Sequence, residues 1–255
     1  MSKKVKVGGV FIDRVSRSML ASMMVCDCDA QLAKPKLVFS ANGQSVSMAA
    51  TNPAFSRDYL AADICHADGM SAVFASRLFT RTPLPERIST TDFFHDAARS
   101  AEQHGLSFYF LGGTVETVEA AYRAAQRQYP GIRWAGYRDG YFGVEEEADV
   151  CRVITQSGAD VLWVGLGRPG QEAFCNRNRD RLVGVTWLKT CGGLFDFIAG
   201  RHARAPRWVQ TLGFEWAFRL CLEPRRLMRR YATTVPHALF LFALQSGSVA
   251  DDAAR

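Results

Sequence analysis

The stretch LSFYFLGGTVETVEAAYRAAQRQY, residues 106–129, indicates the fold class of this chain. A mostly apolar run leads into Gly112-Gly113-Thr114, and a segment with apolar residues at helical spacing follows. Two glycines at a strand-to-helix turn let backbone N–H groups approach a phosphate group. They do not form Gly-x-Gly-x-x-Gly, so a dinucleotide cofactor is not indicated, and a purely structural turn explains them equally well.

The same alternation of strand and helix patterns extends over most of the chain. Helical patterns cover residues 16–25, 44–50, 71–79, 93–104, 115–129, 145–157 and 173–181, and strand patterns cover residues 5–12, 36–40, 106–111, 132–137, 160–166 and 183–190. Such alternation predicts an α/β fold with a doubly wound, mostly parallel, Rossmann-like sheet.

Composition narrows the class of protein. The chain has 255 residues, of which 48% are hydrophobic, enough for one large domain or a domain with an appendage. Its seven cysteines are odd in number and scattered, which favours reduced thiols in a cytoplasmic protein. The Cys26-Asp27-Cys28-Asp29 run has no second cluster to complete a tetrahedral site, so no metal is expected. No signal peptide and no apolar run long enough to span a membrane are visible.

Positive charge is concentrated near the C-terminal end. Residues 201–230 contain eight arginines and two glutamates, a net charge of +6 that equals the charge of the whole chain. Trp208, Leu212, Trp216 and Leu220 recur among them at helical spacing, and Pro224 should divide the segment into two helices. We therefore expect a basic amphipathic helical appendage that meets an anionic membrane surface.

Polar residues follow two early strand patterns. Ser40 ends the strand pattern at residues 36–40 and Asn42 follows it, and Asp68 ends the apolar run that begins at Ala62. Ligands of open α/β sheets bind beyond the carboxyl ends of the strands, so these side chains should face one crevice. Taken alone, Asp68-Gly69 is more typical of a simple turn.

Several ordered motifs together resemble the WecG/TagA/CpsF glycosyltransferases over residues 38–231. They are Ser40-Ala41-Asn42, Ala67-Asp68-Gly69-Met70, Leu111-Gly112-Gly113, Gly165-Leu166-Gly167-Arg168-Pro169-Gly170-Gln171-Glu172, Phe195-Asp196-Phe197-Ile198-Ala199-Gly200, Arg204-Ala205-Pro206-Arg207-Trp208, and Glu215-Trp216-Ala217-Phe218-Arg219-Leu220 with Glu223-Pro224-Arg225-Arg226-Leu227. The resemblance implies inverting transfer of a sugar from a UDP-sugar to an undecaprenyl-diphosphate-linked saccharide, at the inner face of the cytoplasmic membrane.

The resemblance also implies roles for particular residues. Asp68 would be the catalytic base, with Ser40 and Asn42 beside it. The UDP-sugar donor would lie against Gly112, Gly113, Gly167, Gln171, Glu172, Arg219 and Arg226. Departures from the family pattern at Thr90, Gly170 and Cys191 leave the donor and acceptor sugars open.

The domain organisation follows from these patterns. Residues 1–200 should form the catalytic core, residues 201–246 the membrane-associated appendage, and residues 247–255 a flexible tail. The sequence leaves the oligomeric state open, and a homo-oligomer stays among the expected partners.

Three other functions compete with a transferase. A regulator could bind the UDP-sugar without turning it over. A nucleic-acid-binding protein could use the arginines, but their interleaving with Trp, Phe and Leu favours an apolar partner, so nucleic acid is not expected. An NAD-dependent enzyme is disfavoured, because the chain lacks the Gly-x-Gly-x-x-Gly motif that binds the dinucleotide.

Overall fold

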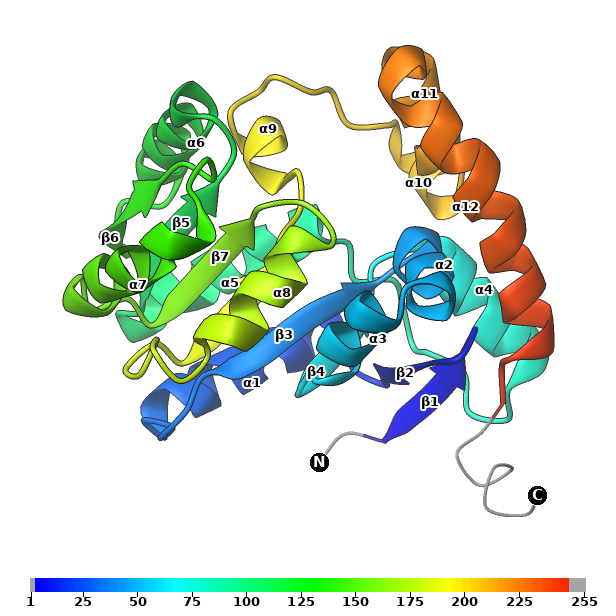
Figure 1. Cartoon of the computed structure of the whole chain (residues 1–255), viewed down its shortest axis with the longest axis horizontal. Coiled ribbons are helices and arrows are strands. Elements are labelled where there is room, and N and C mark those ends of the chain that lie inside the picture. The colour runs from blue at the N-terminus through cyan, green and yellow to red at the C-terminus, as the bar shows by residue number, and fades with distance from the viewer. Residues whose placement is uncertain (1–2, 248–255) are drawn as a thin grey trace.

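A six-stranded parallel sheet forms the centre of the molecule (Figure 1). The computed structural model describes residues 3–247, with the exception of the side chain of Arg226. The strands lie in the order β4-β3-β8-β7-β5-β6. Their bounds are β3 (Lys36–Ala41), β4 (Ile64–Ala67), β5 (Ser107–Gly112), β6 (Arg133–Arg138), β7 (Val161–Gly165) and β8 (Trp187–Thr190).

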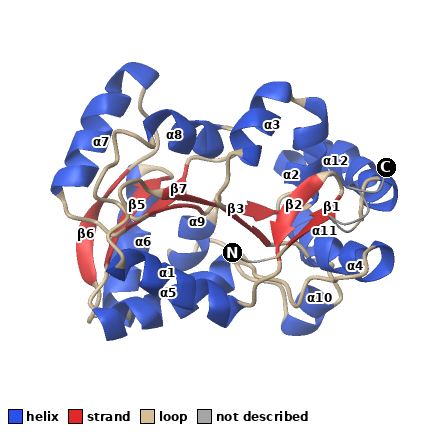
Figure 2. Cartoon of the chain, turned by 90° about the horizontal axis from the view of Figure 1, so that it is seen from below, coloured by secondary structure: helices blue, strands red, loops and turns tan. Residues whose placement is uncertain are grey.

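Helices cover both faces of this sheet (Figure 2). One face carries α1 (Arg17–Asp29), α5 (Thr90–His104), α6 (Val115–Gln128) and α9 (Leu194–Ile198). The other carries α2 (Gly43–Thr51), α3 (Pro53–Leu60), α7 (Glu147–Gln156) and α8 (Gly170–Asn178), with α4 (Met70–Phe79) packed beyond the edge at β4. The doubly wound, Rossmann-like prediction is therefore confirmed.

The side-chain alternation of the strands produces two separate cores. On β7, Val161 and Trp163 face the α1 and α5 side, whereas Leu162 and Val164 face the α7 and α8 side. All four side chains are fully buried, as a near-continuous apolar strand in a parallel sheet requires. The central strands are thus fixed from both faces, and their carboxyl ends form a rigid edge.

The N-terminal segment differs from the prediction of a single strand at residues 5–12. It forms an antiparallel hairpin of β1 (Lys4–Val7) and β2 (Val10–Asp13). Gly8 and Gly9 make the turn with φ of 60° and 84°, a left-handed conformation that favours glycine. The alternation of apolar residues over residues 5–12 indicates strand structure, but it does not reveal the tight turn at Gly8 and Gly9 that divides the segment into two strands.

The C-terminal segment forms α10 (Arg207–Thr211), α11 (Glu215–Leu222) and α12 (Pro224–Leu244), so Pro224 separates two helices as expected. The far half of α12 packs on the main body, where Ala238, Leu241 and Phe242 join the core around α2. The domain boundary at residue 200 and the membrane-binding role of residues 201–246 stay predictions. The packing of α12 shows that part of this segment belongs to the main hydrophobic core.

The predicted tail lies largely outside the described residues, which end at Gly247. Gly247 itself forms an antiparallel bridge with Lys6, and Gly9 N donates to the carbonyl oxygen of Gln245 at 2.9 Å. The hairpin therefore holds the end of α12.

Gly112 is a position where a side chain cannot fit. It ends β5 with φ of 136°, and a Cβ atom there would lie 2.3 Å from the carbonyl oxygen of Gly165. We expect Gly112→Ala to lower the free energy of unfolding by about 2–4 kcal/mol, through overpacking and backbone strain. Gly158→Ala is the control, because Gly158 has φ of 68° and open space around it; its cost should be about 1 kcal/mol. Urea unfolding measures both, and equal losses would contradict the packing explanation.

Candidate active site

The candidate site lies where β3 and β4 end. The two strands pair in parallel with Ser40 opposite His66 and Ala41 opposite Ala67, so the next residues, Asn42 and Asp68, leave the sheet together. Asn42 Nδ2 donates to Asp68 Oδ2 at 3.3 Å. The predicted meeting of these two strand ends is confirmed.

Asp68 also lies at the start of a long helix. Its Oδ1 accepts a hydrogen bond of 2.9 Å from the backbone N–H of Thr90, the first residue of α5. The positive end of the helix dipole favours a negative charge at this point. Arg87 Nε donates to the carbonyl oxygen of Asp68 at 2.9 Å, which fixes the backbone. These hydrogen bonds hold the carboxylate in place, and the residue as a whole is half-buried.

Arg168 holds the end of β3 from the loop after β7. Its Nη1 donates to Asn42 Oδ1 at 2.9 Å, and its Nη2 donates to Ser40 Oγ at 3.0 Å and to the Ser40 carbonyl oxygen at 2.5 Å. Its Nε donates to Glu172 Oε1 at 2.9 Å. Burial opposes the charge of Arg168, but Glu172, together with Tyr59 and Asp68, outweighs it, and the pKa of the guanidinium is raised.

Gln171 and Glu172 are buried and bonded within the protein. Gln171 Nε2 donates to Glu172 Oε1 at 2.9 Å, and Gln171 Oε1 accepts from the backbone N–H of Gly192 at 3.1 Å. Within the described residues, Glu172 Oε2 has no hydrogen-bond partner. These side chains connect Arg168 to the loop after β8, and their predicted contact with the donor stays a prediction.

The three glycines assigned to the donor lie along the same edge. Gly112 ends β5 and pairs with Gly165 at the end of β7. Gly113 and Gly167 follow with φ of 72° and 73°, and the space beside Gly167 is open. Close packing against Gly165 explains why residue 112 is a glycine. The predicted contact of these glycines with a phosphate group stays a prediction.

The C-terminal helices approach this edge through ion pairs and a cation–π contact. Arg87, whose Nε binds the Asp68 carbonyl, pairs through Nη2 with Glu215 of α11. The Arg219 guanidinium lies over the Phe197 ring, 5.4 Å from its centre. Arg226 belongs to α12, but its side chain lies outside the described part. Whether Arg219 or Arg226 reaches a phosphate stays a prediction.

Sequence reasoning assigned no role to Arg168, Arg87, Thr90 or Glu215. Arg168 and Glu215 stand inside quoted motifs, and Glu215 is one of two acidic residues in the arginine-rich segment. An acidic residue among so many arginines indicates an ion pair, so Glu215 could have been identified from the sequence. Nothing in the local pattern marks Arg87, whereas Thr90-Thr91-Asp92 is a pattern typical of a helix start, where backbone N–H groups are free to bind an acceptor.

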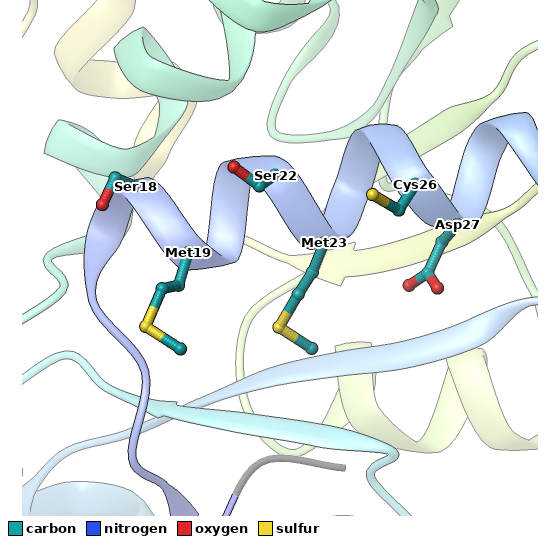
Figure 3. A pocket seen from close by; sticks show the side chains of 6 residues that line it. All are labelled: Ser18, Met19, Ser22, Met23, Cys26 and Asp27. Carbon is teal, nitrogen blue, oxygen red and sulfur yellow. The ribbon is translucent and has the colours of Figure 1, made fainter.

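A surface hollow on α1 lies outside this site (Figure 3). None of the predicted site residues lines it, and one helix supplies all of its lining side chains, which are Ser18, Met19, Ser22, Met23, Cys26 and Asp27. Asp27 already accepts hydrogen bonds from Lys36 Nζ at 2.6 Å and Trp187 Nε1 at 2.8 Å.

Removing the partner of a buried charge should be costly. Glu172→Ala leaves the Arg168 guanidinium, whose side chain is 8% exposed, without its carboxylate. We expect a loss of about 3–5 kcal/mol in the free energy of unfolding. Asp149→Ala, which breaks the exposed pair with Arg152, should change it by less than about 0.5 kcal/mol. Chemical unfolding compares the two, and similar small losses would show that Arg168 does not need Glu172.

Comparison with known proteins gives the family. The model of the "Glycosyl transferase WecG/TagA/CpsF family" matches residues 5–250. An N-acetylglucosaminyldiphosphoundecaprenol N-acetyl-beta-D-mannosaminyltransferase of Bacillus spizizenii strain W23 is 30% identical over 230 residues, 88% of this chain and 87% of the relative. A protein of the same name from Bacillus subtilis strain 168 is 33% identical over 173 residues, 66% of each chain. With a match over nearly its whole length, and with Asp68 and Asn42 meeting at the expected strand ends, this chain belongs to the WecG/TagA/CpsF family of glycosyltransferases.

Proposed function

We propose that this glycosyltransferase moves a hexosyl or N-acetylhexosaminyl group from a UDP-sugar to an undecaprenyl-diphosphate-linked saccharide, with inversion, in surface or exopolysaccharide synthesis. The observation that carries the proposal is the placement of Asp68, a half-buried residue whose carboxylate is held between Asn42 and the start of α5. The two Bacillus relatives are by name transferases that act on a diphosphoundecaprenol-linked sugar, which supports the acceptor class.

Asp68 acts as the base in this proposal. It takes the proton of the acceptor hydroxyl while that oxygen forms a bond to the anomeric carbon of the donor sugar. The bond from the anomeric carbon to the UDP oxygen breaks on the opposite face, which inverts the configuration and releases UDP. Asn42 and the Thr90 N–H hold the carboxylate in line with the hydroxyl. Ser40 keeps the Arg168 guanidinium against the strand end.

The leaving diphosphate needs positive charge around it. We assign this role to Arg219 and Arg226 of the C-terminal helices, because a guanidinium is permanently charged and binds phosphate through two N–H groups. Backbone N–H groups at Gly112, Gly113 and Gly167 would complete the donor site. The proposal uses no metal and no organic cofactor.

The acceptor class suggests that the protein works at a membrane surface. The described residues contain no helix long and apolar enough to cross a bilayer. Arg207, Arg225 and Arg229 are exposed on the C-terminal helices. Large apolar side chains are exposed beside them, namely Trp208, Leu212, Phe214, Trp216, Leu222 and Met228. We assign this surface to anionic lipid on the inner face of the cytoplasmic membrane.

The alternative is a regulator that binds the UDP-sugar without chemistry. In that case the loss of the Asp68 carboxylate would leave its biological output intact. The hydrogen bonds on Asp68 favour the enzyme, because both oxygens are positioned while the residue stays half-buried.

The first test is a transfer assay with a lipid-diphosphate-linked monosaccharide in anionic vesicles and a panel of UDP-sugars. We expect one donor to give product and Asp68→Asn to lower kcat by about 10²–10⁴-fold, the usual contribution of a general base. Asp63→Asn is the matched control, since Asp63 precedes the opposite end of β4 and pairs with Arg179. Its kcat should stay within about twofold of wild type.

Two results would contradict the proposal. Tight UDP binding without turnover of any donor would favour the regulator. Turnover that survives Asp68→Asn unchanged would remove Asp68 as the base.

Vesicle binding tests the membrane surface. Trp208, whose exposed fraction is 67%, lies beside Arg207 at the start of α10. We expect Trp208→Ala to weaken sedimentation with anionic vesicles about tenfold, since a buried aromatic ring carries much of the energy of interfacial binding. Tyr141→Ala, which removes an aromatic ring exposed by 77% in the loop after β6, should bind like wild type. Equal binding by the two variants would contradict the assignment. So would wild-type binding that is as strong to neutral vesicles, or in high salt, as to anionic vesicles in low salt.

A further inference from the structure

The helix that follows Asp68 turns its large apolar side chains outward. On α4, the exposed fractions of Phe74, Leu78 and Phe79 are 39%, 75% and 45%. The residues that α4 buries are smaller, namely Ala72, Val73, Ala75 and Ser76. A surface helix ordinarily buries its large apolar residues and exposes polar ones. The exposed face of α4 therefore has no apolar partner in the part of the chain that the structure describes.

The same helix carries only positive charge. Residues 69–85 contain Arg77 and Arg81 and no aspartate or glutamate, so their net charge is +2. Both arginines are exposed, and among the described residues neither guanidinium has a hydrogen-bond or ion-pair partner. Phe74, Arg77 and Leu78 have the i, i+3, i+4 spacing that places side chains on one helix face. Unpaired cations among exposed apolar side chains fit a partner that offers both negative charge and an apolar interior.

α4 lies beside the surface of the C-terminal helices that we assign to the membrane. Gly213, in the turn between α10 and α11, packs so closely on α4 that a Cβ atom there would lie 3.2 Å from Met70 Cβ and 3.3 Å from the Phe74 ring. Its chain neighbours Leu212 and Phe214 are exposed. α4 also contacts α12, and Figures 1 and 2 place α4, α10, α11 and α12 at one end of the molecule. The exposed side chains of α4 thus extend that surface onto the catalytic core.

A lipid bilayer fits this face better than a second copy of the chain. In a symmetric dimer through α4, each copy would bring Arg77 and Arg81 to the same interface, and residues 69–85 hold no acidic residue to compensate them. An anionic bilayer supplies phosphate groups for the arginines and, just below them, hydrocarbon for the exposed apolar side chains.

We propose that α4 is a second membrane-contacting element of this protein. Phe74, Leu78 and Phe79 insert at the boundary between lipid headgroups and acyl chains, and Arg77 and Arg81 bind lipid phosphates.

The inference rests on the proposed function, in which the acceptor is a membrane lipid and Asp68 is the base. It goes beyond the surface on the C-terminal helices, because α4 is part of the core and begins two residues after Asp68. At about 1.5 Å per residue α4 is only about 15 Å long, so its contact with lipid holds Asp68 within about that distance of the bilayer surface. The acceptor sugar is joined to its lipid by a diphosphate at the same surface, so the contact brings base and acceptor together.

A fluorescent label at residue 78 tests the contact directly. The full chain carries L78C labelled with the environment-sensitive dye NBD, after C26S and C221S remove the two exposed cysteines. The vesicles contain phosphatidylglycerol and phosphatidylcholine, without acceptor. We expect NBD emission to rise and move to shorter wavelength when vesicles are added, because the dye leaves water for the acyl boundary. V153C is the matched control, since Val153 is exposed by 45% on α7, at the other end of the molecule (Figure 1); its emission should not change.

Sedimentation with the same vesicles measures the apolar contribution. L78E should weaken binding about tenfold, because a charged side chain then has to enter the acyl boundary. V153E introduces the same charge on α7 and should stay within about twofold of wild type. Both side chains are exposed, and far-UV circular dichroism establishes that the variants fold.

The electrostatic contribution is measured with the arginines. R77Q/R81Q should weaken binding to anionic vesicles about 25-fold, from about fivefold for each arginine near the surface, and should make it less sensitive to salt. R123Q/R127Q removes the same charge from α6, which lies at the other end of the molecule (Figure 1), and should bind nearly like wild type.

Unchanged NBD emission at residue 78 in a chain that sediments with the vesicles would overturn the proposal. So would emission that rises with protein concentration and no vesicles, together with a doubled mass, because a second copy would then cover α4. Transfer plays no part in these measurements, since acceptor and donor are both left out. A positive result at residue 78 in a protein that transfers no sugar would overturn the proposed function and leave the membrane contact of α4 standing.

Discussion

The active-site edge of this protein depends on the buried guanidinium of Arg168. A permanent charge inside a fold must be surrounded by acceptors, and Arg168 finds them in Ser40, Asn42 and Glu172. These acceptors belong to two different strand–helix units, one following β3 and one following β7. Arg168 therefore bonds the two units together at this edge, and through Asn42 the same network extends to Asp68.

Asp68 is held differently from the charges around it. Arg168 and Glu172 are enclosed and paired, whereas Asp68 is half-buried and receives its hydrogen bonds from an amide and a backbone N–H. Neutral donors orient a carboxylate without neutralising it, and partial exposure leaves room for a proton donor to approach. The enclosed pair thus supports the strand end, and Asp68 beside it is the residue to which the proposed function assigns the role of base.

Arg87 joins the C-terminal helices to this support. One side of its guanidinium holds the Asp68 carbonyl, and the other holds Glu215 on α11. Arg204 extends the same cluster from the start of that segment, with Glu215 3.6 Å away and Asp92 of α5 in contact. Arg87 thus connects α11 to the backbone of Asp68, and with it the proposed membrane surface to the end of the sheet where Asp68 lies.

The sequence by itself determined the class of fold and the meeting of the two strand ends that carry Asn42 and Asp68. The period of the apolar residues and the glycine turns encode these features locally, as at residues 106–129 and at Pro224. The Gly8–Gly9 turn is also encoded locally, although the hydrophobic pattern alone does not reveal it. The packing of Phe242 into the main core was decided by tertiary structure. So were the partners of Asp68: Thr90 follows it by 22 residues, and Arg168 reaches Asn42 from 126 residues away. A buried charge finds its acceptors only when distant segments fold together, and no pattern within one segment records which acceptors those will be.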